Sequence, residues 1–133
     1  MSEERLQAEV VRYIGYKYPK ALYCASAGGI YTTPRQAFKM KRTGYKKGFP
    51  DLFIYEARNS YFGLALEIKT NKGRATSHQK QWIKALTDRG YKAVVAKGFD
   101  NIIKEIDEYF IGKQTMGIKK NWLNIYKHEQ SKR

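Results

Sequence analysis

Apolar positions recur along the chain with two different periods, and these periods predict helices and strands. Within residues 3–17 they fall three or four apart, at Leu6, Val10, Tyr13 and Ile14. This spacing is typical of an amphipathic helix, with Ser2 able to cap its start and Pro19 following its end. A hydrophobic stripe along one side predicts that this helix packs against a core.

The same criteria predict the remaining elements. They are a short strand within 21–26, a helix from Thr33-Pro34 to Gly44, strands over 51–56 and 61–70, a helix over 77–89, a strand over 93–97 and a helix capped by Asp100. The polar turn 57–60 predicts that the two strands beside it form an antiparallel hairpin. Helices and strands in this order indicate an α/β fold, with helices flanking a mixed sheet that has the hairpin at its centre.

Residues 112–133 allow two interpretations. They hold six basic residues and one acidic residue, interleaved with apolar side chains that include Trp122. The segment is either an extra helix or an arm that acts against DNA or a second subunit. The first helix and the Trp122 region are the candidates for a dimer interface.

Charge changes the picture more than any other global property. Lysine and arginine total 26 against 12 acidic residues, a net charge of +14. This excess favours a nucleic-acid partner over a merely solvated basic surface. The chain has no run of 18 apolar residues, so we expect no membrane span. A single cysteine excludes an intrachain disulfide, and the charged first residues do not resemble a signal peptide, so we expect a cytoplasmic, intracellular location.

The basic residues are concentrated in the sequence. Six of them and no acid lie between residues 35 and 47: Arg35, Lys39, Lys41, Arg42, Lys46 and Lys47. We interpret this run as phosphate contacts that position DNA without reading its sequence, and the alternative is a solvated loop. Lys72 and Arg74, which follow the second strand of the hairpin, are expected to contact the DNA backbone as well.

The strand over 61–70 predicts where chemistry takes place. Side chains alternate between its two faces, so Phe62, Leu64, Leu66 and Ile68 form an apolar row for the core. Glu67 and Lys69 then share the opposite face, which we expect to be open. Asp51 begins the partner strand, and an antiparallel hairpin brings it beside them. Two adjacent carboxylates repel each other unless a cation or a proton lies between them.

Oxygen ligands of this kind suit Mg²⁺ or Mn²⁺. Asp51, Glu67 and the backbone carbonyl of Ile68 are the candidate metal ligands. Such an ion and Lys69 together suit hydrolysis of a phosphodiester, where Lys69 orients water or stabilises charge on the phosphate. The alternative is a non-catalytic basic DNA-binding protein, in which Glu67 and Lys69 are an exposed charged pair and Asp51 a turn residue.

Three segments resemble a known family. GFPDLFIY, ALEIKT and SHQKQWIKALTDRGYKAVV are similar to the virus-type replication-repair nuclease (VRR-NUC) domain of the PD-(D/E)xK superfamily, over about Leu6 to Phe110. The resemblance implies a restriction-endonuclease-like core within residues 1–112. The basic extension over 113–133 lies outside the resemblance, and it either follows this domain or forms part of it. It also implies site roles: Asp51 and Glu67 as metal ligands, Lys69 as the catalytic lysine, Gln79 as a glutamine near the active site, and Glu9 as an acid completing the metal site.

The resemblance also carries expectations about substrate and assembly. Single-domain members of the family come mostly from bacteriophages and resemble dimeric nucleases that cut branched DNA, including four-way junctions. Because no fused domain is recognisable in this sequence, we expect a homodimer acting on such DNA, in a pathway such as DNA repair. The same active site would also serve a sequence-specific, restriction-like endonuclease, and an RNA target is not excluded by the sequence.

Overall fold

The computed structural model describes residues 1–26, 32–112 and 116–132, with all of their side chains except those of 116–122. The elements are α1 (Glu3–Lys17), β1 (Tyr23–Ala25), α2 (Pro34–Arg42), β2 (Leu52–Ile54), β3 (Leu64–Lys69), α3 (Ser77–Asp88), β4 (Lys92–Lys97), α4 (Phe99–Ile111) and α5 (Met116–Ser131). Every helix and strand predicted from the periodicity is present. Within these ranges, none of the helices has the length and apolar character needed to cross a membrane.

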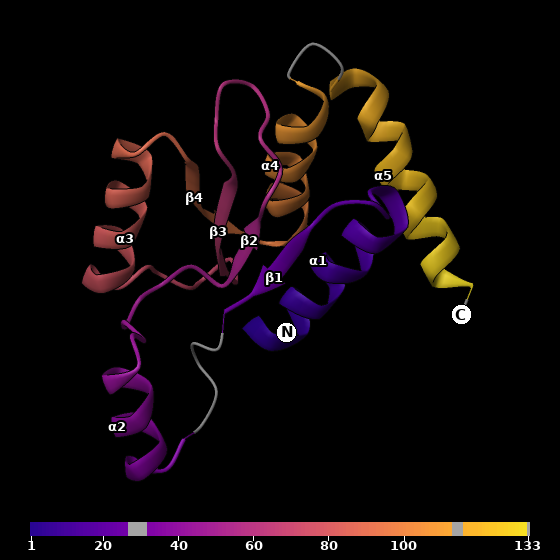
Figure 1. Ribbon diagram of the computed structural model, residues 1–133. Helices are drawn as coiled ribbons and strands as arrows, with labels where there is room; N and C mark the ends of the chain where they lie inside the picture. Colours follow the sequence, from indigo (N-terminus) through magenta and orange to yellow (C-terminus); the bar gives the residue numbers. More distant parts are fainter. Residues whose placement is uncertain (27–31, 113–115, 133) are drawn as a thin grey trace.

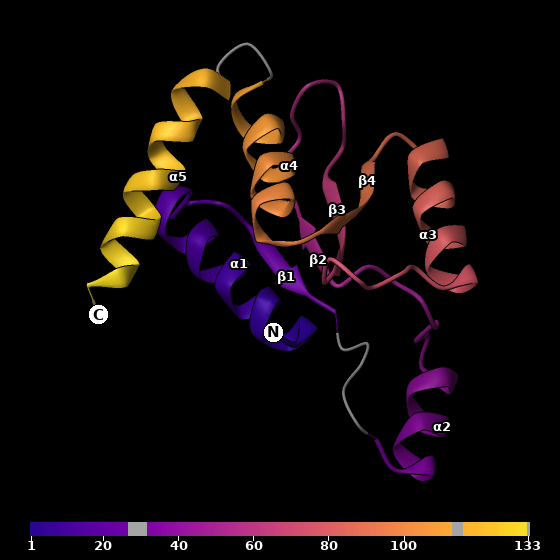
Figure 2. The same cartoon turned by 180° about the vertical axis from the view of Figure 1, so that it is seen from behind.

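The strands form one mixed sheet in the order β1-β2-β3-β4. β2 is antiparallel to both β1 and β3, whereas β4 runs parallel to β3. A parallel pair needs a crossover connection, and α3 supplies it. Figures 1 and 2 show α3 on one face of the sheet, α1 and α4 on the other, and α5 outside these two helices. The predicted mixed α/β fold with helices flanking the sheet is thus confirmed.

The core lies mainly between the sheet and the layer of α1 and α4. It contains the predicted stripe of α1 and alternate residues of β3: Leu6, Val10, Tyr13, Ile14, Leu64, Leu66 and Ile68. A smaller cluster on the other face joins Phe53, Ala65 and Leu86 under α3. Both faces of the sheet are therefore covered at its centre, which explains why every residue of β3 is buried.

Three expectations about these elements are wrong. Gly98, not Asp100, is the N-cap of α4, and Asp100 lies in the first turn, where its carboxylate pairs with Lys127 at 2.6 Å. Phe62 does not join the core but is 66% exposed, because β3 begins only at Leu64. The face of β3 opposite the core row is not open, since α3 packs over it.

The segment over 112–133, for which the sequence allowed either a helix or an arm, contains the helix α5. Tyr126 of α5 is fully buried and packs edge-on against Tyr13 at a ring distance of 5.1 Å. It also stacks against Phe99 at the start of α4. α5 is thus attached to the main core, rather than extended as an arm, at the residues described. The side chain of Trp122 lies outside the described residues.

Candidate active site

The hairpin brings two carboxylates together at one end of the sheet. Leu52 pairs with Leu66, so Asp51, one residue earlier, lies opposite Glu67. The Ile68 N–H donates a hydrogen bond to Oδ2 of Asp51 at 2.8 Å, which holds this carboxylate against the end of β3. The predicted neighbourhood of Asp51 and Glu67 therefore exists, and it follows directly from the hairpin register.

Glu67 is the most unusual residue of the pair. It is only 1% exposed, and neither of its carboxylate oxygens accepts a hydrogen bond from an N–H or O–H donor of the described residues. Burial raises the pKa of Glu67 to about 9, and the neighbouring Asp51 carboxylate adds to this rise. Two neighbouring carboxylates repel each other unless a proton or a cation lies between them. Ionised Glu67 therefore needs a cation beside it.

Lys69 completes the group. Two residues after Glu67 on the same strand, its side chain lies on the same face, and the residue is only 7% exposed. Its charge opposes the rise in the pKa of Glu67. Gly73, in the loop after β3, packs so closely over this lysine that a Cβ there would lie 3.3 Å from its side chain. Lys69 is therefore an enclosed ammonium rather than a solvated surface charge.

The acid contributed by the first helix differs from the expected one. Oε2 of Glu3, in the first turn of α1, lies 3.8 Å from Nζ of Lys69. Glu3 also contributes to raising the pKa of Glu67. Glu9 instead pairs with Arg12 at 3.5 Å and lines a cavity of about 270 Å³ beside Tyr126. The structure therefore brings Glu3, and not Glu9, to the group.

Gln79 lies beside the same end of the sheet, but its side chain caps the start of α3. It is the third residue of α3, where its Oε1 accepts a hydrogen bond from the Thr76 N–H at 2.8 Å and closes a capping box. None of the contacts described for its side chain reaches Asp51 or Glu67. Its backbone packs against Gly48, where a Cβ would lie within 2.9 Å of Gln79 N. Gln79 thus helps to position the segment that leads into Asp51.

A divalent cation fits the oxygen atoms present. Asp51 and Glu67 supply two carboxylates, and the two buried oxygens of Glu67 meet no donor from residues 1–26, 32–112 or 116–132. The Ile68 carbonyl lies on the same edge of β3 as its N–H, which points to Asp51. Within the described residues, no three His, Cys, Asp or Glu side chains form a closed metal cage. An Mg²⁺ or Mn²⁺ ion tolerates this, because it commonly keeps water and phosphate oxygens among its ligands.

A further polar group lies on the same row of the sheet. The Ser26 N–H donates to the Asp51 carbonyl at 2.9 Å, one step beyond the pairing of Ala25 with Leu52. Side chains of directly opposed residues share one face, so the Ser26 hydroxyl lies on the face of Asp51 and Glu67. Its oxygen is buried and has no hydrogen-bond partner in the part of the chain that the structure describes. No sequence pattern pointed to this residue, because the register of β1 is set by pairing alone.

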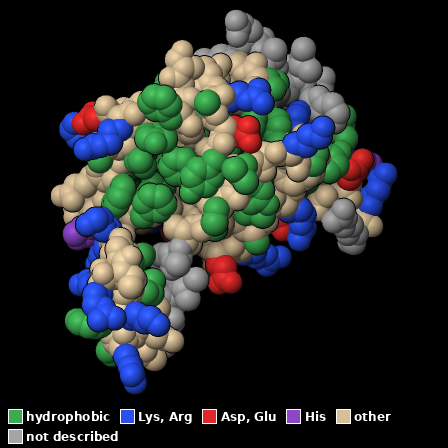
Figure 3. Space-filling view, in the orientation of Figure 1, with side chains coloured by type: hydrophobic (Ala, Val, Ile, Leu, Met, Phe, Trp, Pro, Cys, Tyr) green, Lys and Arg blue, Asp and Glu red, His purple; other side chains and the backbone are tan. Residues whose placement is uncertain are grey.

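All eight cations predicted to contact DNA are exposed. They are Arg35, Lys39, Lys41, Arg42, Lys46 and Lys47 around α2, and Lys72 and Arg74 in the loop between β3 and α3. No residue of α2 is buried, and the helix projects from the body of the protein (Figures 1 and 2). Figure 3 shows lysine and arginine side chains gathered on this projection. The cations are thus available to a polyanion near the acidic pair.

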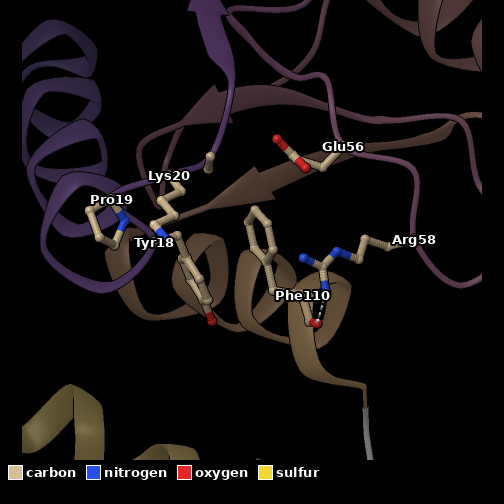
Figure 4. A pocket seen from close by; sticks show the side chains of 7 residues that line it. Tyr18, Pro19, Lys20, Glu56, Arg58 and Phe110 are labelled. Atoms are coloured by element: carbon tan, nitrogen blue, oxygen red, sulfur yellow. Dashed lines mark hydrogen bonds between the residues drawn. The ribbon is translucent and has the colours of Figure 1, made fainter.

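A separate cavity lies at the other end of β2. It has a volume of about 250 Å³ and is lined by Tyr18, Pro19, Lys20, Ala21, Glu56, Arg58 and Phe110. The Arg58 guanidinium donates to the Phe110 carbonyl at 3.3 Å and lies over the Phe110 ring (Figure 4). Because Glu56 follows β2 and Asp51 precedes it, this cavity is not part of the acidic group.

Comparisons with known proteins give a consistent result. The model of a family described as "VRR-NUC domain" matches residues 3–100. A solved structure described as "VRR_NUC domain protein" has 37% sequence identity and a TM-score of 0.73, over 83% of this chain and 88% of its own. None of the curated proteins matches the chain. The matched range contains Asp51, Glu67 and Lys69.

Proposed function

The chain belongs to the VRR-NUC family, whose members are nucleases of the PD-(D/E)xK type. We propose that it is an Mg²⁺- or Mn²⁺-dependent endonuclease that cuts branched DNA. The observation that carries the proposal is the pairing of Asp51 with Glu67, whose buried oxygens have no donor among the described residues, beside the enclosed Lys69. These three residues match the Asp, Glu and Lys of the family pattern.

Each residue has a role that its position supports. Asp51, Glu67 and the Ile68 carbonyl hold the divalent ion, which supplies Lewis acidity at the scissile phosphate. Lys69 holds the attacking water and stabilises the negative charge that develops on the phosphate oxygens. Glu3, 3.8 Å from the Lys69 ammonium, helps to position that group. Gln79 acts through the loop at Gly48 rather than at the reacting atoms.

The basic surface supports DNA as the substrate. The exposed cations around α2 and after β3 lie on the segments that lead into Asp51 and out of Lys69. Phosphates bound there would place a strand against the acidic pair without reading its sequence. Selection of branched DNA and assembly as a homodimer rest on the resemblance. A two-fold dimer would present two sites to the two equivalent strands of a four-way junction.

The test is a cleavage assay with labelled four-way junction, flap and linear DNA, with and without Mg²⁺ or Mn²⁺. We expect metal-dependent cutting near the branch, with little sequence bias. Cutting of linear duplex at one short sequence would instead indicate a restriction-like enzyme. Sedimentation equilibrium measures the oligomeric state independently, and a monomer throughout would contradict the dimer.

Variants of Lys69 separate catalysis from binding. Lys69→Ala and Lys69→Met, which retains more of the buried side-chain volume, should bind DNA within about threefold of wild type. Both should lose about 100-fold or more in single-turnover cleavage, the usual loss when a charge-stabilising group is removed. Lys84→Ala is the matched control, because this lysine is exposed and forms an ion pair with Asp88 of the same helix. Unchanged cleavage by both Lys69 variants would favour a non-catalytic DNA-binding protein.

A further inference from the structure

α2 carries an exposed phenylalanine in the middle of a cationic face. Phe38 is 68% exposed. Residues three and four positions apart lie on the same side of a helix, so Phe38 is flanked by Arg35 before it and Arg42 after it. Lys39 and Lys41 border this face on either side. The aromatic ring and the cations therefore point away from the protein together.

The opposite side of α2 has a different character. It carries Ala37 and Met40, which are partly buried and uncharged. The helix is fixed at its start by a capping box between Thr33 and Gln36, in which each side chain accepts a hydrogen bond from the other's backbone. The outward position of Phe38 thus follows from the orientation of a well-formed helix rather than from an irregular loop.

The base of the projection is attached to α3. The Trp82 indole N–H donates to the Lys47 carbonyl at 3.2 Å. Gly48 has φ 90° and packs so closely against His78 that a Cβ would lie 2.7 Å from its backbone. Asp51 follows three residues later. The cationic face of α2 is therefore part of a segment that is anchored at Lys47 and Gly48 and leads into β2 (Figure 1).

The chemistry of this face fits one type of partner. A phenylalanine surrounded by cations is poorly suited to a protein partner with an apolar surface, because four charges would be desolvated with it. Nucleic acid matches both components, since phosphates pair with the cations and a base offers its π-face to the ring. In a continuous duplex the base faces are stacked on one another, whereas at a branch or flap some are free.

We propose that Phe38 stacks on an unpaired base of branched DNA while Arg35 and Arg42 hold the flanking phosphates. This deepens the proposed function and rests on it for the identity of the substrate. Phe38 is then a specificity-determining residue. It favours DNA with exposed base faces and contributes little to the binding of continuous duplex.

The test measures binding without metal, so that it does not depend on cleavage. Wild type, Phe38→Ala and Phe38→Trp are titrated onto fluorescent flap and linear DNA, with 2-aminopurine at the unpaired position next to the branch. Phe62→Ala is the matched control: this phenylalanine is 66% exposed, and it lies before β3, at the opposite end of that strand from Lys69.

We expect Phe38→Ala to weaken flap binding by about 10- to 100-fold, the effect of losing one stacked base. Linear duplex binding should change by less than about threefold. Phe38→Trp should bind the flap as tightly as wild type and quench the fluorescence of 2-aminopurine. Phe62→Ala should behave as wild type. Equal losses on both substrates, no loss on the flap, or a change of sedimentation in Phe38→Ala that marks a subunit contact would each overturn the proposal. An absence of cleavage in the wild type would contradict the nuclease function without affecting this measurement.

Discussion

The substitution Glu67→Gln should stabilise the metal-free protein, and increasingly so as the pH rises. Burial raises the pKa of Glu67 from 4.5 to about 9 in the folded state. Between these values the folded protein binds a proton that the unfolded chain has released, so the free energy of unfolding falls as the pH rises. The neutral amide of the variant has no such proton to lose.

The size of the effect follows from the pKa difference. One unit corresponds to about 1.4 kcal/mol, so wild type is destabilised at pH 8, relative to pH 4.5, by up to about 5 kcal/mol at this site. Solvent penetration would reduce this, and we expect roughly 2–5 kcal/mol. For a chain of this size, even the lower value corresponds to about 5 °C or more in melting temperature.

The assay is thermal and urea unfolding in EDTA at pH 5 and pH 8. The difference between the variant and wild type should grow in favour of Glu67→Gln across this interval, whereas the exposed control Glu4→Gln should track wild type at both values. Saturating Mn²⁺ should then stabilise wild type much more than the variant, because a ligand bound only by the folded state raises stability. A constant difference between pH 5 and 8 would refute the reasoning.

Three further predictions follow from other contacts. Glu3→Gln should slow single-turnover cleavage about tenfold and Glu9→Gln less than twofold, because only the first carboxylate reaches the active-site lysine; equal rates in the two variants would contradict this. Tyr18→Phe should lower the unfolding free energy in urea by about 1.5–3 kcal/mol, since its hydroxyl donates to the buried Asp107 carboxylate at 2.6 Å. Gly48→Ala should cost about 1–3 kcal/mol in the same assay, because φ 90° strains any side chain there. A stability equal to wild type would refute either estimate.

The central pair could be predicted because its geometry is local. A single turn joins the strands of the hairpin, so the pairing of Asp51 with Glu67 follows from a short stretch of sequence. The alternation of β3 places Lys69 on the same face for the same reason. Asn59 and Ser60, with φ 53° and 67°, form the turn at the polar residues that predicted it.

The acid of α1 could not be chosen from the sequence. Glu3 and Glu9 border the same apolar stripe on opposite sides: Glu3 precedes Val10 by seven residues, and Glu9 precedes Tyr13 by four. Which border faces the end of β3 depends on how the helix is rotated against the sheet. Packing against α4 and α5 fixes the rotation of α1, and the sequence of α1 alone does not predict this packing.

The burial of the site also could not be predicted from the sequence. Alternation showed that Glu67 and Lys69 share a face, but not that Gly73 and α3 would cover it and leave both residues buried. The caps of α2 predicted a helix, yet nothing in residues 34–42 predicted that it would bury none of its residues. The burial of Glu67 and Lys69 depends on contacts between segments that are distant in the chain. The exposure of α2 depends on the lack of such contacts among the described residues.

Anomalous diffraction from crystals of the protein grown with Mn²⁺ tests the metal site most directly. We predict one strong peak between Asp51 and Glu67, roughly 2.1 Å from an oxygen of each, with the Ile68 carbonyl as a further ligand. A peak elsewhere, or an empty pair at saturating Mn²⁺ with both carboxylates ordered, would contradict the assignment of these residues as the metal site of a nuclease.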